Sequence, residues 1–81
     1  MPQPAATDDQ KLQYLQLQQE ADFALWKARE GNAEIRQAYA RHLAGEGAAP
    51  AAQELDALAE LERDAEAKYR ALRQFVRDFF G

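Results

Sequence analysis

A single break in an otherwise continuous helical pattern most constrains what this chain can fold into. The segment Gly45-Glu46-Gly47-Ala48-Ala49-Pro50 separates two long stretches that contain no proline. Glycine adopts the left-handed backbone conformation that ends many helices, and proline is common where a new helix begins. The pattern therefore predicts a helix over 8–44, a turn over 45–50 and a second helix over 51–80.

Apolar residues recur in both stretches at the spacing of an α-helix. Leu58, Ala65, Leu72 and Phe79 follow one another at intervals of seven. The corresponding stripe in the first stretch, beside Tyr14, comprises Leu17, Ala21, Leu25, Ala28, Ile35, Tyr39 and Leu43. Such stripes are typical of amphipathic, coiled-coil-like helices, and no segment shows the alternation of a strand. The fold class predicted is all-α: an antiparallel two-helix hairpin that forms a single domain over 8–81.

Two features of the first helix allow more than one interpretation: the residue at which it begins and its continuity across Gly31-Asn32. Residues 1–7 carry two prolines and no apolar anchor, so they are predicted to be a flexible tail, with Thr7 or Asp8 as the helix N-cap. The pair Gly31-Asn32 could end one helix and begin another, which would give three helices. We favour one continuous helix, because the apolar stripe keeps its seven-residue spacing across this site.

The two predicted helices complement each other when the hairpin closes near Gly47. This register sets Ala38 near Leu58 and Ile35 near Leu61, so that small and large side chains interdigitate. The acidic start of the second helix then lies beside a cationic group formed by Arg36, Arg41 and His42. Such exposed pairs are worth about 0–1 kcal/mol each, so they select the orientation more than they stabilise it.

The apolar residues exceed what one seam between two helices can cover. Leu12, Leu15, Phe23 and Trp26 form a second patch, about 120–180° around the first helix from the main stripe. A further group at the C-terminus comprises Phe75, Phe79 and Phe80. A contiguous apolar patch on a small protein usually marks an interface. We expect a homodimer that completes a four-helix bundle. The alternatives are a protein partner that covers the patch and a monomer that folds back on itself.

Residues capable of catalysis or metal binding are sparse. The chain has no cysteine and one histidine, His42. His42 precedes Glu46 by four residues, which is a weak pattern for a metal site. A histidine cation near a helix C-terminus, where it is favoured, is the better explanation. The acidic pairs Glu60/Asp64 and Glu62/Glu66 could act in acid–base chemistry only if buried, and their helical positions favour a solvated face. We expect no enzyme activity, no metal, no cofactor and no small-molecule substrate.

An arginine row on the second helix offers a function of a different class. Arg63, Arg70 and Arg77 recur every seven residues with Arg73 alongside, a spacing that could meet the phosphates of a nucleic acid. The alternative is a solvated face with ion pairs such as Glu66–Arg70. The net charge of −4 and the absence of aromatic residues within the row favour the solvated face. Nucleic-acid binding is therefore the second hypothesis, behind a protein-interaction module.

The sequence also bears on the location of the protein. The N-terminus has no basic and apolar segments of the kind that form a secretory signal, and no stretch approaches the ~20 apolar residues that a membrane span needs. The absence of cysteine fits a reducing compartment. We expect a cytoplasmic protein without membrane contact, and the abundance of alanine and arginine hints at a bacterial source.

Overall fold

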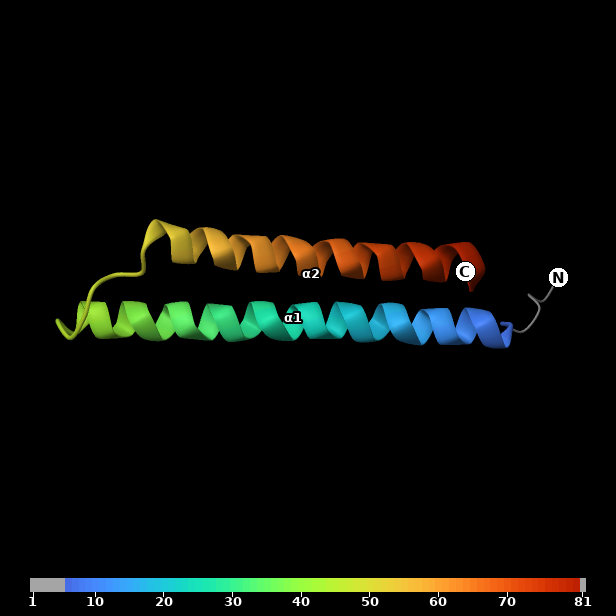
Figure 1. Ribbon diagram of the computed structural model, residues 1–81, viewed down its shortest axis with the longest axis horizontal. Coiled ribbons are helices and arrows are strands. Elements are labelled where there is room, and N and C mark those ends of the chain that lie inside the picture. The colour runs from blue at the N-terminus through green and yellow to red at the C-terminus, as the bar shows by residue number, and fades with distance from the viewer. Residues whose placement is uncertain (1–5, 81) are drawn as a thin grey trace.

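Two antiparallel α-helices make up the part of the chain that the structure describes (Figure 1). The computed structural model describes residues 6–80, in which α1 spans Asp8–Leu43 and α2 spans Ala52–Phe79. The hairpin is a rod of 64 × 18 × 15 Å. The predicted all-helical hairpin is confirmed. α1 begins at the predicted residue, and the other three helix ends lie one residue inside the predicted bounds.

A capping box starts α1. The backbone N–H of Gln10 donates to Thr7 Oγ1 at 3.1 Å, and the N–H of Thr7 donates to Gln10 Oε1 at 2.9 Å. These two bonds satisfy donors that the first helical turn otherwise leaves without partners. Of the two predicted N-cap residues, Thr7 and Asp8, the structure uses Thr7, and residues 1–5 of the predicted tail lie outside the described residues.

The end of α1 is set by Gly45, whose φ of +77° lies in the left-handed region. The N–H of Gly45 donates to the carbonyl of His42 at 3.0 Å, and the N–H of Glu46 donates to that of Arg41 at 2.8 Å. This pair of bonds is the Schellman motif, which occupies the last carbonyl groups of a helix. The chain then runs through Pro50 to Ala51, the N-cap of α2, which makes no side-chain cap.

The interhelical core consists mainly of alanines, with one leucine and one phenylalanine from α2. Its buried members are Ala21, Ala24 and Ala28 from α1 and Leu58, Ala65 and Phe75 from α2. The next positions of the predicted stripes are half-buried, namely Leu17, Leu25, Ile35 and Leu72. Small residues let the two helix axes approach closely, so this hairpin buries little apolar area per residue.

The predicted stripes are wrong at their ends. Tyr39 and Leu43 are exposed, the latter by 83%, and Phe79 is 51% exposed. α1 continues past the start of α2 at the turn end, because the connection doubles back along α1 before α2 begins (Figure 1). The last turns of α1 therefore have no helix beside them.

α1 is continuous through Gly31, as predicted. The glycine lies against α2, where a Cβ added to it would be 3.3 Å from Leu58 Cδ1 and 3.4 Å from Leu61 Cδ1. The predicted register set Leu58 near Ala38, but Leu58 lies against Gly31, about two helical turns earlier in α1. The reason is again the connection, which returns along α1 before α2 begins instead of reversing the chain symmetrically about Gly47.

The ion pairs do not join the helices as predicted. Within residues 6–80 every ion pair lies inside α2, and the three are Arg63–Glu60, Lys68–Asp64 and Arg70–Glu66. Pairs three or four residues apart meet on one face of a helix without requiring any partner helix. Their carboxylates, Glu60, Asp64 and Glu66, are three of the four residues considered for acid–base chemistry from the sequence.

Candidate interaction surface

Four large apolar side chains lie on the face of α1 that points away from α2. Leu12, Leu15, Phe23 and Trp26 are each between 50% and 58% exposed, and we call them the outer strip. The opposite face of the same helix carries the buried Ala21, Ala24 and Ala28. The hairpin thus uses the small residues of α1 for its own core and leaves four of its largest apolar residues in water.

The aromatic end of the outer strip is organised. The rings of Phe23 and Trp26 stack at a centroid distance of 6.0 Å and an interplanar angle of 13°. The Lys27 Nζ atom lies 4.9 Å from the centroid of the Phe23 ring, a cation–π arrangement. Phe23 and Trp26 thus form an exposed aromatic pair with a positive charge over one of its rings.

The predicted C-terminal patch is divided between core and surface. Phe75 is 6% exposed and packs against Phe79 and Phe80, with ring centroids 4.8 and 5.5 Å away. Phe80 also meets Tyr14 of α1 edge-on at 5.8 Å. Phe75 therefore belongs to the hairpin core, Phe80 ties the end of α2 to α1, and Phe79 offers apolar surface.

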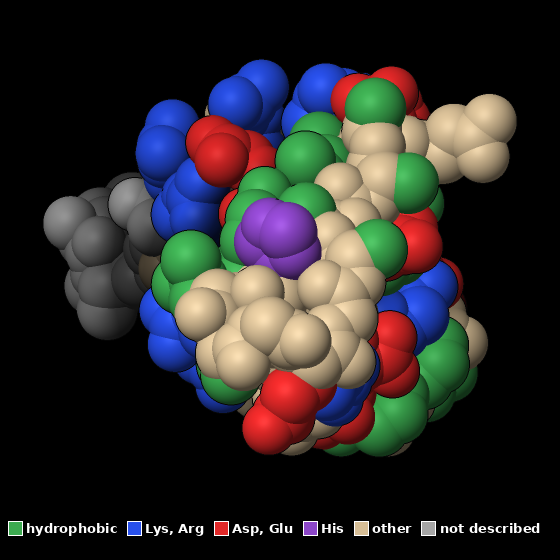
Figure 2. Space-filling model, turned by 90° about the vertical axis from the view of Figure 1, so that its left-hand side faces the viewer, with side chains coloured by type: hydrophobic (Ala, Val, Ile, Leu, Met, Phe, Trp, Pro, Cys, Tyr) green, Lys and Arg blue, Asp and Glu red, His purple; other side chains and the backbone are tan. Residues whose placement is uncertain are grey.

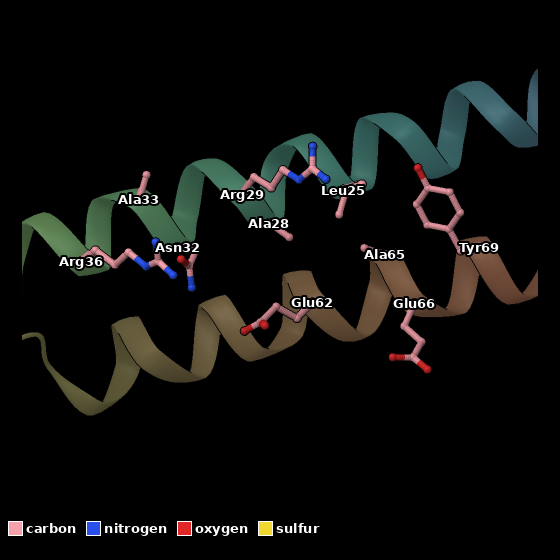
Figure 3. A pocket seen from close by; sticks show the side chains of 10 residues that line it. All are labelled: Leu25, Ala28, Arg29, Asn32, Ala33, Arg36, Glu62, Ala65, Glu66 and Tyr69. Carbon is pink, nitrogen blue, oxygen red and sulfur yellow. The ribbon is translucent and has the colours of Figure 1, made fainter.

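One side of the hairpin is hollowed between the helices (Figure 3). Small residues, Ala28 and Ala65, line this groove of about 710 Å³, together with arginines of α1 and glutamates of α2. The Tyr69 ring extends from α2 toward α1, while Glu66 points away from α1, where it pairs with Arg70 (Figure 3). The groove is open, and its polar lining combines Asn32 and Tyr69 with charged side chains of both signs.

Tyr69 makes the one side-chain hydrogen bond between the helices in the described part of the chain. Its hydroxyl donates to Asp22 Oδ1 at 2.5 Å. This bond raises the pKa of Tyr69 above its ordinary value; desolvation and the negative charge of Asp22 act in the same direction, and Arg29 opposes them. This contact was not predicted from the sequence. A tyrosine at the flank of the stripe, able to reach a carboxylate on the other helix, was the available signal.

His42 serves the turn. Its Nδ1–H donates to the carbonyl oxygen of Gly47 at 2.9 Å, and Figure 2, which views the turn end, shows the histidine at the surface. Over residues 6–80 no three acidic or histidine side chains gather in a way that could hold a metal ion. The acidic residues Glu60, Asp64 and Glu66 each lie beside a cationic side chain of α2.

The arginine row lies on exposed positions of α2. Arg63 and Arg70 pair with Glu60 and Glu66 of the same helix, which reduces the positive field of the row. Arg73 and Arg77 line a shallow depression with Tyr14, Leu72 and Val76. Half of the row thus has the ion pairs that the sequence favoured for a solvated face.

In the part of the chain that the structure describes, neither helix is long and apolar enough to cross a membrane. Comparison with known proteins yields no match to a protein family, to a characterised protein or to a solved structure.

Proposed function

We propose that this protein is a non-enzymatic interaction module that binds a second helical surface through the outer strip of α1. The observation that carries the proposal is the position of Leu12, Leu15, Phe23 and Trp26, all at least half exposed on the face opposite to the core. Tryptophan in an apolar cluster is enriched among the residues that dominate binding energy. The strip can be covered by a second hairpin, which gives a four-helix assembly, or by another protein.

The small core supports the same proposal. Most of the buried residues of the hairpin are alanines, which contribute little hydrophobic free energy. Small domains of this kind usually gain stability from disulfides, metals or association, and the chain has no cysteine. Association through the outer strip would add the apolar burial that a single seam cannot provide.

Light scattering over a concentration series tests the proposal when wild type is compared with Trp26→Ala. We expect associated wild type and at least a tenfold loss of affinity in the variant, with helicity by circular dichroism unchanged. Leu43→Ala is the matched control, since Leu43 is an exposed apolar residue of α1 outside the outer strip. An associated Trp26→Ala variant with wild-type affinity would show that the strip is not the contact.

A further inference from the structure

The side of the hairpin shown in Figure 3 is hollowed in two places. Tyr69 lines the groove of about 710 Å³, and Arg73, four residues later on α2, lines the depression of about 320 Å³ beside Tyr14. On α1, Tyr14 and Leu25 are eleven residues apart, which is about three helical turns. Both hollows therefore lie on one side of the seam, and they extend about 33 Å along α1 from Tyr14 to Arg36. We call the two hollows together the arginine groove.

The arginine groove has an excess of positive charge, although the chain as a whole has a net charge of −4. Its charged lining residues are Arg29, Arg36, Glu62, Glu66, Arg73 and Arg77. Glu66 pairs with Arg70, and within residues 6–80 none of the four lining arginines forms an ion pair. The neighbouring Asp22 accepts a hydrogen bond from Tyr69. Arginines without counter-charges therefore line both hollows.

The other side of the seam has the reverse balance of charge. The charged residues that line the groove there are Glu34, Glu54 and Arg41. The positive charge of the hairpin is thus concentrated on the side of the arginine groove. An anionic partner is attracted to this side in preference to the other.

The floor of the arginine groove is apolar. Ala28 and Ala65 lie between the two helices (Figure 3), and Leu72 and Val76 line the second hollow. Small side chains leave space for the larger apolar residues of a helix packed against them. An apolar floor between charged rims suits an amphipathic helix. A nucleic acid would meet the arginines through its phosphates and leave this floor uncovered.

We propose that the arginine groove binds an acidic amphipathic α-helix of a partner protein, which lies along the seam as a third helix. Its apolar face covers the floor, and its carboxylates pair with Arg29 and Arg36 on α1 and with Arg73 and Arg77 on α2. A helix of about 22 residues spans the groove. The groove shares no residue with the outer strip, so this inference goes beyond the proposed function and does not depend on it.

Two synthetic 22-residue peptides test the charge requirement. They share one leucine-rich helical face, and the positions that flank this face are all glutamate in one peptide and all glutamine in the other. We expect the wild-type protein to bind the glutamate peptide at least tenfold more tightly, measured by fluorescence anisotropy at low ionic strength. The net negative charge of the chain opposes this result, so it requires a local positive site. A glutamate peptide that binds no more tightly than the glutamine peptide would overturn the proposal.

Substitutions in the groove locate the contact. Arg29→Gln combined with Arg36→Gln should weaken binding of the glutamate peptide at least fivefold, with helicity by circular dichroism unchanged. The matched control combines Arg41→Gln with Arg63→Gln, which removes the same charge from exposed arginines outside the groove, and its affinity should stay within twofold of wild type. Glu62→Gln should tighten binding, because it removes a negative charge from the lining. Equal losses in the two double variants would show attraction to the net charge alone and overturn the site.

The second hollow is tested separately. Arg73→Gln combined with Arg77→Gln should also weaken binding of the glutamate peptide at least fivefold, since a helix that spans the groove contacts both pairs of arginines. A loss at Arg29 and Arg36 without a loss here would overturn the spanning helix.

The remaining outcomes identify a different site or a different occupant. Binding of the glutamate peptide that is lost in Trp26→Ala and retained in the arginine variants would place the peptide on the outer strip and overturn the groove. A single-stranded RNA of 20 nucleotides that binds more tightly than the glutamate peptide at the same ionic strength, and loses affinity in the arginine variants, would overturn a protein helix as the occupant. A monomeric wild type, which would contradict self-association through the outer strip, leaves this inference unchanged.

Discussion

Gly31 of α1 and Leu58 of α2 lie so close that a Cβ on the glycine would be 3.3 Å from Leu58 Cδ1. A glycine in a helix interior costs about 1 kcal/mol relative to alanine. Here the missing side chain provides the space into which Leu58 and Leu61 pack. The residue that looked like a helix break in the sequence is a point of close helix approach.

Gly31→Ile should therefore destabilise the hairpin by about 1–3 kcal/mol, since its branches would overlap the two leucines. Urea denaturation at fixed protein concentration measures the effect. Ala40→Ile is the matched control, because Ala40 is exposed on the same helix, and it should cost less than about 0.5 kcal/mol. Equal stability of the two variants would contradict the close approach at Gly31.

Gly45→Ala should cost about 1–2 kcal/mol, because an L side chain is strained at the φ of +77° that ends α1. Gly47→Ala tests the same change two residues later, where open space surrounds the added Cβ. We expect that variant to stay within about 0.5 kcal/mol of wild type. The prediction fails if both substitutions lower the urea midpoint equally.

The Tyr69–Asp22 hydrogen bond predicts a loss of stability at alkaline pH. The pKa of Tyr69 is raised in the folded protein because its hydroxyl donates to the Asp22 carboxylate. A raised pKa means that the folded state holds the proton more tightly, so the contribution is fully present below the unfolded value of 10.0. This stabilising contribution is lost as the pH rises through the pKa of Tyr69 in the folded protein.

Thermal melts from pH 8 to 11 measure this loss, and absorbance of the phenolate follows the titration. Tyr69→Phe should be less stable than wild type at pH 8 and should approach it at pH 11. Asp22→Asn should bring the pKa of Tyr69 down toward its ordinary value. A Tyr69 titration unaffected by Asp22→Asn would exclude the carboxylate as the cause.

The C-terminal phenylalanines should differ in their effects on stability. Phe75 is buried and contacts two other aromatic rings, so Phe75→Leu should cost about 1–2 kcal/mol through lost packing and ring contacts. Phe79→Leu, at a position that is half exposed, should cost less than about 0.5 kcal/mol. Chemical denaturation of the two variants compares them directly, and the reverse order would place Phe79 in the core.

Local chemistry made much of the fold predictable from the sequence. The capping oxygen of Thr7 and the conformational freedom of Gly45 act over a few residues, so the ends of α1 could be identified without any knowledge of packing. The outer strip was also visible, because apolar residues at helical spacing fall on one face wherever the helix lies. Its exposure followed once the alanine face was occupied by α2.

The sequence by itself determined two helices, their ends and their apolar faces, because these depend on backbone propensities and on spacing within eleven residues. Only the tertiary structure decided the register, which sets Leu58 against Gly31, buries Phe75 and leaves Tyr39 and Leu43 without a neighbouring helix. The path of residues 44–51 governs how far α2 returns along α1. The contacts that mark this register, Gly31 with Leu58 and Asp22 with Tyr69, join residues far apart in the chain, so helical spacing alone does not reveal them.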